Sequence, residues 1–147
     1  MKKIYLLAIL GFTSLFSHAQ SEQTDSWKIS WNKKTILQTG TSNETANIGK
    51  IKSADLKKNY VLKLEYNEGD ATKERAWIRS FTLVDETGKE IFKKDSTRSL
   101  KFTASQLKKL FAGKKQIKIY TIAIPSDPDL AARVRVRRVH LCTLEVQ

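Results

Sequence analysis

The sequence predicts an all-β protein, an antiparallel β-sandwich with one short helix near residues 104–112. About eight short runs alternate apolar and polar residues, which is the pattern of strands that are buried on one face. Turn-forming residues separate these runs, and a hydrophobic content of 40% is sufficient for the interior of one domain. Both a jelly roll and an immunoglobulin-like arrangement of strands fit this pattern.

The N-terminal residues have the pattern of a secretory signal peptide. Lys2 and Lys3 precede an apolar run over residues 4–16, which is too short for a membrane-spanning helix. Ser17 and Ala19 occupy the −3 and −1 positions of a signal-peptidase site. We therefore expect a periplasmic or secreted product with no transmembrane segment after cleavage. The expected divisions are a signal peptide at 1–19, a flexible leader at 20–26 and a single β-sandwich domain at 27–147.

The N-terminal half of the domain begins with a clear strand pattern. Trp27, Ile29 and Trp31 alternate with polar residues, which predicts a strand with both tryptophans in the core. Ser53 is placed to cap a short helical turn. The charged residues 67–75 are predicted to form a loop. Further strands are expected over 35–39, 48–52 and 60–66.

Residues 76–93 predict a β-hairpin. Gly88 can adopt the positive φ that the turn between its two strands requires. Trp77, Phe81 and Leu83 lie on one face of the first strand. Arg79 interrupts this face, which indicates a position near a sheet edge.

The C-terminal third predicts a helix between strands. Thr103 and Gln106 have the spacing of a capping box, which starts a helix over 104–112. The apolar positions of the last strand change phase, which predicts a β-bulge near Arg137 and Arg138. Strands are expected over 100–102, 117–124 and 133–146, with one helical turn at 129–132.

Two segments carry a resemblance to known proteins. Residues 55–66, DLKKNYVLKLEY, resemble the turn and following strand of carbohydrate-binding jelly rolls, which are also secreted and of similar size. Residues 131–142, AARVRVRRVHLC, are similar to the end of small exported bacterial β-sandwich proteins. The first resemblance implies glycan binding, whereas the second implies no activity.

Few residues of the exported chain are suited to catalysis. His140 would be its only histidine, and it lies two residues from Cys142 on a predicted strand, so both side chains would face the same side. This spacing is loose for a pair of nucleophile and base. We therefore expect no catalytic residue, and a Cys142 that is either buried or paired between chains.

Metal ligands are also few. One histidine and one cysteine cannot complete a zinc or blue-copper site. Asp127 and Asp129 could contribute to a calcium site, although a solvated turn is the simpler interpretation. We expect no metal and no cofactor.

The positive charge is the most unusual bulk property, since 27 Lys and Arg against 15 Asp and Glu give a net charge of +12. On a strand, Arg133, Arg135 and Arg137 would project from one face and attract anions. Trp77 beside Arg79 could stack on a sugar ring, although a place in the core is the simpler role for Trp77. The candidate ligand-binding residues are therefore Trp77, Arg79, Arg133, Arg135 and Arg137.

These patterns favour an exported, non-catalytic binding module for anionic or glycan ligands at the cell envelope, such as an acidic glycan or lipopolysaccharide. Nucleic acid is not expected, because Trp27 and Trp31 have the pattern of core residues and not of a base-stacking surface. One alternative is a structural or assembly partner of another envelope protein that uses an exposed strand edge. Another is a small hydrolase with paired carboxylates. Lysines that protect sheet edges would explain the charge without any ligand.

Overall fold

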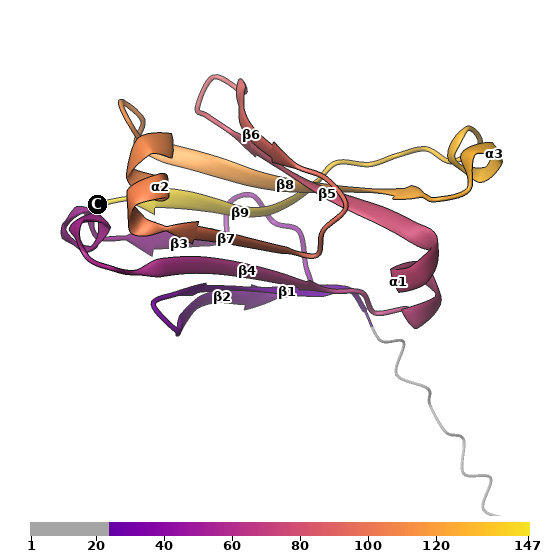
Figure 1. Cartoon of the computed structure of the whole chain (residues 1–147), viewed down its shortest axis with the longest axis horizontal. Coiled ribbons are helices and arrows are strands. Elements are labelled where there is room, and N and C mark those ends of the chain that lie inside the picture. The colour runs from indigo at the N-terminus through magenta and orange to yellow at the C-terminus, as the bar shows by residue number, and fades with distance from the viewer. Residues whose placement is uncertain (1–23) are drawn as a thin grey trace, which may run out of the picture.

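Two β-sheets packed face to face form the protein, whose computed structural model describes residues 24–147 (Figure 1). The predicted all-β sandwich with a helix in the region 104–112 is confirmed. The predicted signal peptide at 1–19 and the leader residues 20–23 lie outside the described residues. The first strand begins at Ser26, slightly before the expected start of the domain.

The first sheet contains four strands in the order β2-β1-β4-β7, and all neighbouring strands in it are antiparallel. Alternate residues of β1 and β4 are buried, as the period of two predicts for strands with one inward face. The strands are β1 (Ser26–Trp31), β2 (Lys34–Thr39), β4 (Val61–Asn67) and β7 (Ser99–Thr103).

The second sheet contains five strands in the order β3-β9-β8-β5-β6. They are β3 (Ile48–Ile51), β5 (Trp77–Val84), β6 (Glu90–Lys94), β8 (Gln116–Pro125) and β9 (Val139–Val146). β3 runs parallel to β9, so the antiparallel pairing of the predicted sandwich does not extend to this one pair. The chain crosses between the sheets before and after β3, so no hairpin turn forces that strand to run against its neighbour.

Short helices close the two ends of the sandwich (Figure 1). α2 (Ala104–Leu110) is the predicted helix, and it starts with the predicted capping box. The prediction of a loop over 67–75 is wrong, because Asp70 caps α1 (Ala71–Ala76) by accepting a hydrogen bond from the Thr72 N–H at 2.8 Å. The other helical turns are η1 (Ser53–Lys57) and α3 (Pro128–Ala131). No helix within residues 24–147 has the length and apolar character needed to cross a membrane.

The inner faces of both sheets enclose the hydrophobic core, and the predicted burial of Trp27 and Trp31 is confirmed. The Trp27 ring stacks on Tyr66 of β4, with 5.9 Å between the ring centres. Its indole Nε1 donates a hydrogen bond to the carbonyl of Leu141 at 2.9 Å. Trp27 therefore links the first sheet to β9 in the second sheet.

The last strand is shorter than predicted. It begins at Val139, and residues 133–138 form no regular strand. β8 pairs with β9 only as far as Thr121, which lies opposite Val139. The chain before Val139 therefore has no neighbouring strand to join, and the alternating arginines there do not form part of a sheet.

The predicted change of phase in the last strand is present, but it lies at Leu141 and not near residues 137–138. His140 pairs with Tyr120, and Cys142 pairs with the preceding residue of β8, so Leu141 is the extra residue of a β-bulge. Because successive residues of β8 face opposite sides, His140 and Cys142 also lie on opposite faces of the sheet. The expectation that these two side chains face the same side is wrong.

Candidate functional site

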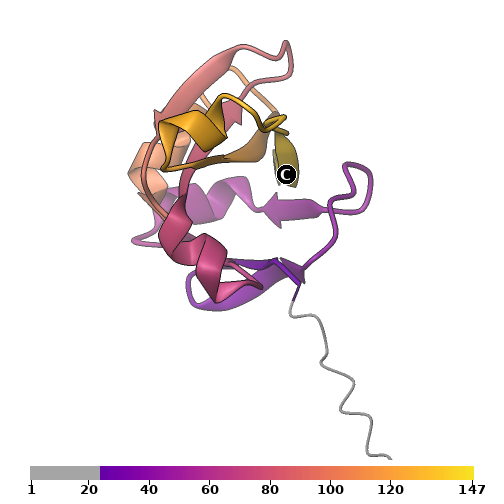
Figure 2. The same ribbon diagram turned by 90° about the vertical axis from the view of Figure 1, so that its right-hand side faces the viewer.

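The connection between β8 and β9, residues 126–138, carries the predicted arginines, and we call it the arginine arm. It leaves β8 after Pro125, turns through α3 and returns to β9. Figure 1 shows it extending beyond the sheets at the end of the sandwich that also carries α1, and Figure 2 looks onto this end. Most side chains of the arm are exposed.

Local hydrogen bonds hold the arm in place. The Asp127 carboxylate accepts from the N–H groups of Asp129 and Leu130, at 2.8 and 3.1 Å, and so caps α3. The backbone N–H and the hydroxyl of Ser126 both donate to the carbonyl of Ala76, at 2.8 and 2.9 Å, which ties the arm to the end of α1. Asp127 thus acts as a helix cap, and the described residues contain no group of three or more His, Cys, Asp or Glu that could hold a metal ion.

The predicted arginines of the arm are open to solvent. Arg133, Arg135 and Arg137 are exposed, and their side chains form no hydrogen bond or ion pair with any residue of 24–147. Arg138 differs, because its guanidinium lies over the ring of Tyr120, at 4.0 Å from the ring centre. A guanidinium carries five N–H donors that match phosphate, sulfate and carboxylate oxygens. The arm therefore presents three arginines whose donors are available to an anion.

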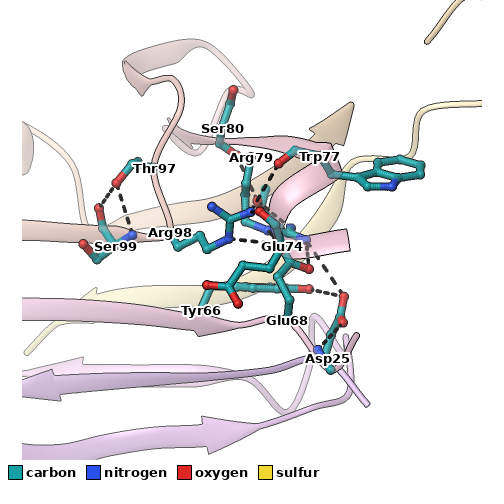
Figure 3. Close-up of polar contacts among 12 residues, drawn as sticks. Asp25, Tyr66, Glu68, Glu74, Trp77, Arg79, Ser80, Thr97, Arg98 and Ser99 are labelled. Atoms are coloured by element: carbon teal, nitrogen blue, oxygen red, sulfur yellow. Dashed lines mark hydrogen bonds and ion pairs between the residues drawn. The ribbon is translucent and has the colours of Figure 1, made fainter. Parts of the chain in front are cut away.

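Arg79, the other predicted arginine, is buried inside the same end of the sandwich and is only 5% exposed. Its Nε and Nη2 donate to the two carboxylate oxygens of Glu68, at 2.7 and 2.9 Å (Figure 3). Its Nη1 donates to Thr121 Oγ1 at 3.1 Å, and the guanidinium lies 3.6 Å from the centre of the Tyr66 ring. Each nitrogen of this side chain already has an oxygen partner, and burial closes it to a ligand.

Asp25 extends this arrangement toward the start of β1. Its carboxylate accepts hydrogen bonds from the Tyr66 hydroxyl at 2.8 Å and from the Gly69 N–H at 2.9 Å. One of its oxygens lies 3.9 Å from Arg79 Nη2. Burial raises the pKa of Tyr66, so the hydroxyl keeps the proton that it donates. Asp25 thereby fixes the chain just before the first strand.

Arg98 completes the arrangement on the side of α1. Its Nε lies 3.7 Å from Glu68 Oε1, and its Nη2 donates to the carbonyls of Glu74 and Trp77, the second at 3.2 Å. Carbonyls at the end of a helix lack partners within the helix, so Arg98 caps α1. We call this group of five side chains the ion-pair cluster: Asp25, Tyr66, Glu68, Arg79 and Arg98. Two carboxylates balance two guanidiniums in it, which indicates a role in holding the fold.

Sequence reasoning missed Glu68, because this residue lies in a run of charges that has the pattern of an exposed loop. The signal that could have found it was Arg79, since an arginine at an inward strand position needs a buried partner of opposite charge. The partner lies 11 residues earlier in the chain, on the other side of α1. Without that helix in the prediction, the two residues could not be brought together.

Trp77, the predicted aromatic platform, lies near the base of the arm. It is half-buried and does not belong to the hydrophobic core cluster. Its position in β5 is opposite Pro125, where the arm begins. Figure 3 shows its indole pointing away from the ion-pair cluster. The ring is thus placed beside the arm, where a bound sugar could contact it.

The two residues considered for catalysis are separated by the sheet. Cys142 is fully buried in the core, as one of the two alternatives predicts, and burial raises the pKa of its thiol to about 12. His140 lies on the other face, with Nε2 at 3.0 Å from Thr143 Oγ1. Burial lowers the pKa of His140. The thiol and the imidazole therefore cannot act together as nucleophile and base.

The α1 end of the sandwich thus combines a charge-balanced, partly buried cluster with an open cationic surface. A net charge of +12 on the whole chain draws anions toward such a surface over a long range. Exposed guanidiniums then hold phosphate or carboxylate groups, often through two hydrogen bonds. No protein-family model matches this chain, and a search of curated proteins found no match either.

Proposed function

We propose that the protein is a non-catalytic binding module that recognises anionic glycans, including lipopolysaccharide, at the cell envelope through the arginine arm. The observation that carries this proposal is that Arg133, Arg135 and Arg137 are exposed and form no ion pair with any described residue. An arginine that serves the fold has partners, as Arg79 has in Glu68. The envelope location rests on the signal-peptide pattern of residues 1–19.

The arm is suited to this role because its base is fixed. Ser126 is hydrogen-bonded to the end of α1, and α1 is in turn capped by Arg98 of the ion-pair cluster. The arginines therefore project from a supported segment, which reduces the entropy that an anion must remove on binding. Trp77 at the base of the arm supplies an aromatic ring for the apolar face of a sugar.

The test is a binding titration of the purified chain without the predicted signal peptide. The probes are lipopolysaccharide and a soluble sulfated glycan, each at low and at physiological salt. A variant with Arg133→Gln, Arg135→Gln and Arg137→Gln should bind both probes at least about tenfold more weakly and show a smaller salt dependence. A protein that binds neither probe at low salt would refute the proposal.

The matched control removes the same charge elsewhere. Lys34, Lys94 and Lys101 are exposed strand residues without an ion pair among the described residues. Changing all three to Gln should leave the affinity within about twofold of the unaltered protein, because screening limits distant charges to small effects. Equal losses in the two triple variants would show that net charge alone causes binding, and would remove the arm from the proposal.

Assembly with another envelope protein is a second candidate, because the sandwich is open where β6 and β7 form the edges of their sheets. A groove of about 280 Å³ lies there, lined by Phe92, Phe102, Gln106, Lys109 and Leu110. Phe92 and Phe102 meet edge to face, with 4.9 Å between ring centres. An extended segment of a partner could add to either edge and place an apolar side chain in the groove. The test measures binding of a purified envelope protein to the chain. If Phe92→Ser abolishes this binding and leaves glycan binding unchanged, the result favours this candidate.

A further inference from the structure

The exposed apolar side chains of the protein gather at the end that carries the arginine arm. Within residues 24–147, the exposed large hydrophobic residues are Ile78, Ile124, Leu130 and Val136, at 40% to 45%. Ile78 and Ile124 are cross-strand partners in β5 and β8, next to the base of the arm. Leu130 and Val136 belong to the arm itself. We call these four residues the apolar tip.

The backbone of the arm places the apolar and cationic residues close together. The carbonyl of Leu130 accepts from the N–H groups of Arg133 and Val134, at 3.0 and 3.2 Å, which turns the chain back after α3. Val136 follows this turn and lies between Arg135 and Arg137 in the sequence. Guanidiniums and exposed apolar side chains are therefore mixed over one short protruding segment.

This mixture fits one kind of anionic surface. A soluble glycan offers charges but no apolar phase, so it would leave the apolar tip in water. A lipid surface offers phosphate oxygens directly above acyl chains, and so satisfies both kinds of side chain at once. A half-buried tryptophan beside the arm also suits the interface between headgroups and acyl chains, where tryptophan is enriched.

We propose that the arginine arm docks the protein on a lipid surface that carries phosphate headgroups. Arg133, Arg135 and Arg137 contact the phosphates, and Leu130 and Val136 enter the layer below them. The proposal rests on the proposed function, which supplies the anionic ligand, and adds that a lipid bears the anion. Phosphatidylglycerol and the lipid part of lipopolysaccharide share this chemistry, so both are tested.

The experiment measures co-sedimentation of the protein with three kinds of vesicle: phosphatidylcholine alone, phosphatidylcholine with phosphatidylglycerol, and phosphatidylcholine with lipopolysaccharide. The protein should bind the two anionic vesicles and leave the neutral one unbound. A variant with Leu130→Ser and Val136→Ser should bind the anionic vesicles about tenfold more weakly, because it loses apolar burial. The same variant should bind the soluble sulfated glycan as the unaltered protein does.

Two controls separate insertion from simple adhesion. Ala54→Ser with Ala112→Ser adds two hydroxyls in η1 and just after α2, two elements in contact at the end of the sandwich away from α1 and α3 (Figure 1), and should leave vesicle binding unchanged. Ala132→Cys places a thiol in the arm for an environment-sensitive fluorophore, since the native Cys142 is buried and unreactive. The emission should shift to the blue with anionic vesicles and stay unchanged with the soluble glycan.

The outcomes distinguish this inference from the proposed function. Binding to the glycan without binding to either anionic vesicle overturns the lipid inference and leaves the proposed function standing. Equal vesicle binding by the Leu130→Ser, Val136→Ser variant, or no shift of the fluorophore, also overturns it. Binding to only one of the two anionic vesicles, with weaker binding of that vesicle by the Leu130→Ser, Val136→Ser variant, supports it and identifies the lipid. If no anionic probe binds, both proposals fail.

Discussion

The buried Arg79 and the exposed arginines of the arm lie at the same end of the sandwich, and they have opposite environments. Arg79 is 5% exposed and holds the carboxylate of Glu68 through two hydrogen bonds. Arg133, Arg135 and Arg137 are exposed and have no partner of opposite charge within residues 24–147. The difference shows that burial decides the role of an arginine, because only a buried guanidinium forces a counter-charge to be buried with it.

The largest expected effect comes from removing the carboxylate that balances Arg79. Glu68→Gln should destabilise the protein by about 3–5 kcal/mol, because it leaves a buried guanidinium without its negative partner. Urea denaturation measures this change. The control is Glu65→Gln, whose carboxylate pairs with Lys63 at the surface, 2.6 Å away, and should contribute no more than about 1 kcal/mol.

A double variant sharpens this prediction. Arg79→Met with Glu68→Leu should recover most of the stability lost in Glu68→Gln, because an apolar pair of similar volume carries no uncompensated charge. If Glu68→Gln lowers the free energy of unfolding no more than Glu65→Gln does, the ion-pair cluster stabilises the fold no more than an exposed pair. The contrast between Arg79 and the arm arginines would then be wrong.

A smaller change in stability, which depends on pH, is expected where the arginine arm joins the second sheet. Arg138 belongs to the arm, yet its guanidinium covers Tyr120, whose ring packs edge to face against His140. Burial lowers the pKa of His140 below 6.5, while Glu44 opposes this change and Lys118 adds to it. The unfolded chain therefore takes up a proton before the folded one as the pH falls, and stability decreases below about pH 6.5.

The variant that tests this boundary is His140→Gln. Its melting temperature should fall less than that of the unaltered protein between pH 7.5 and pH 5.5, because the titrating group is gone. Carboxylates titrate mainly below this range, so they affect both proteins alike. Parallel curves for the two proteins would show that protonation of His140 does not destabilise the fold.

The smallest change in stability is expected from substitutions in the arginine arm itself. Changing Arg133, Arg135 and Arg137 to Gln should shift the melting temperature by no more than about 2 °C, since exposed side chains without partners contribute little to stability. Differential scanning calorimetry measures this shift. A loss of stability close to that of Glu68→Gln would mean that the arm arginines serve the fold, which removes the contrast with Arg79.

Most of the fold was predictable because the strands follow a simple local pattern. The β5–β6 hairpin could be predicted from the alternation of apolar and polar residues and from one glycine in the turn. Gly88 adopts a φ of 83°, in the positive range that was predicted. The helix after Thr103 could be predicted from the capping-box spacing alone. α1 was not predictable from hydrophobic spacing, because none of its residues is buried.

The candidate site was less predictable, because its character depends on long-range pairing. The alternation of arginine and valine over 133–137 has the period of a strand, but periodicity does not reveal whether a neighbouring strand is present. The same limit applies to His140 and Cys142, since a bulge at Leu141 changes which face each one occupies. Arg133, Arg135 and Arg137 are nevertheless exposed, as an anion-attracting surface requires, because charged side chains without a buried partner remain in solvent.

The parallel pairing of β3 with β9 bears on how the protein reaches its native state. β9 follows every other described strand along the chain, yet it lies between β3 and β8 in the finished sheet. β3 therefore has no strand to pair with in its sheet until nearly a hundred further residues have been synthesised. A chaperone that shields this unpaired strand while the chain folds would suppress aggregation more than one that shields the early β1–β2 hairpin.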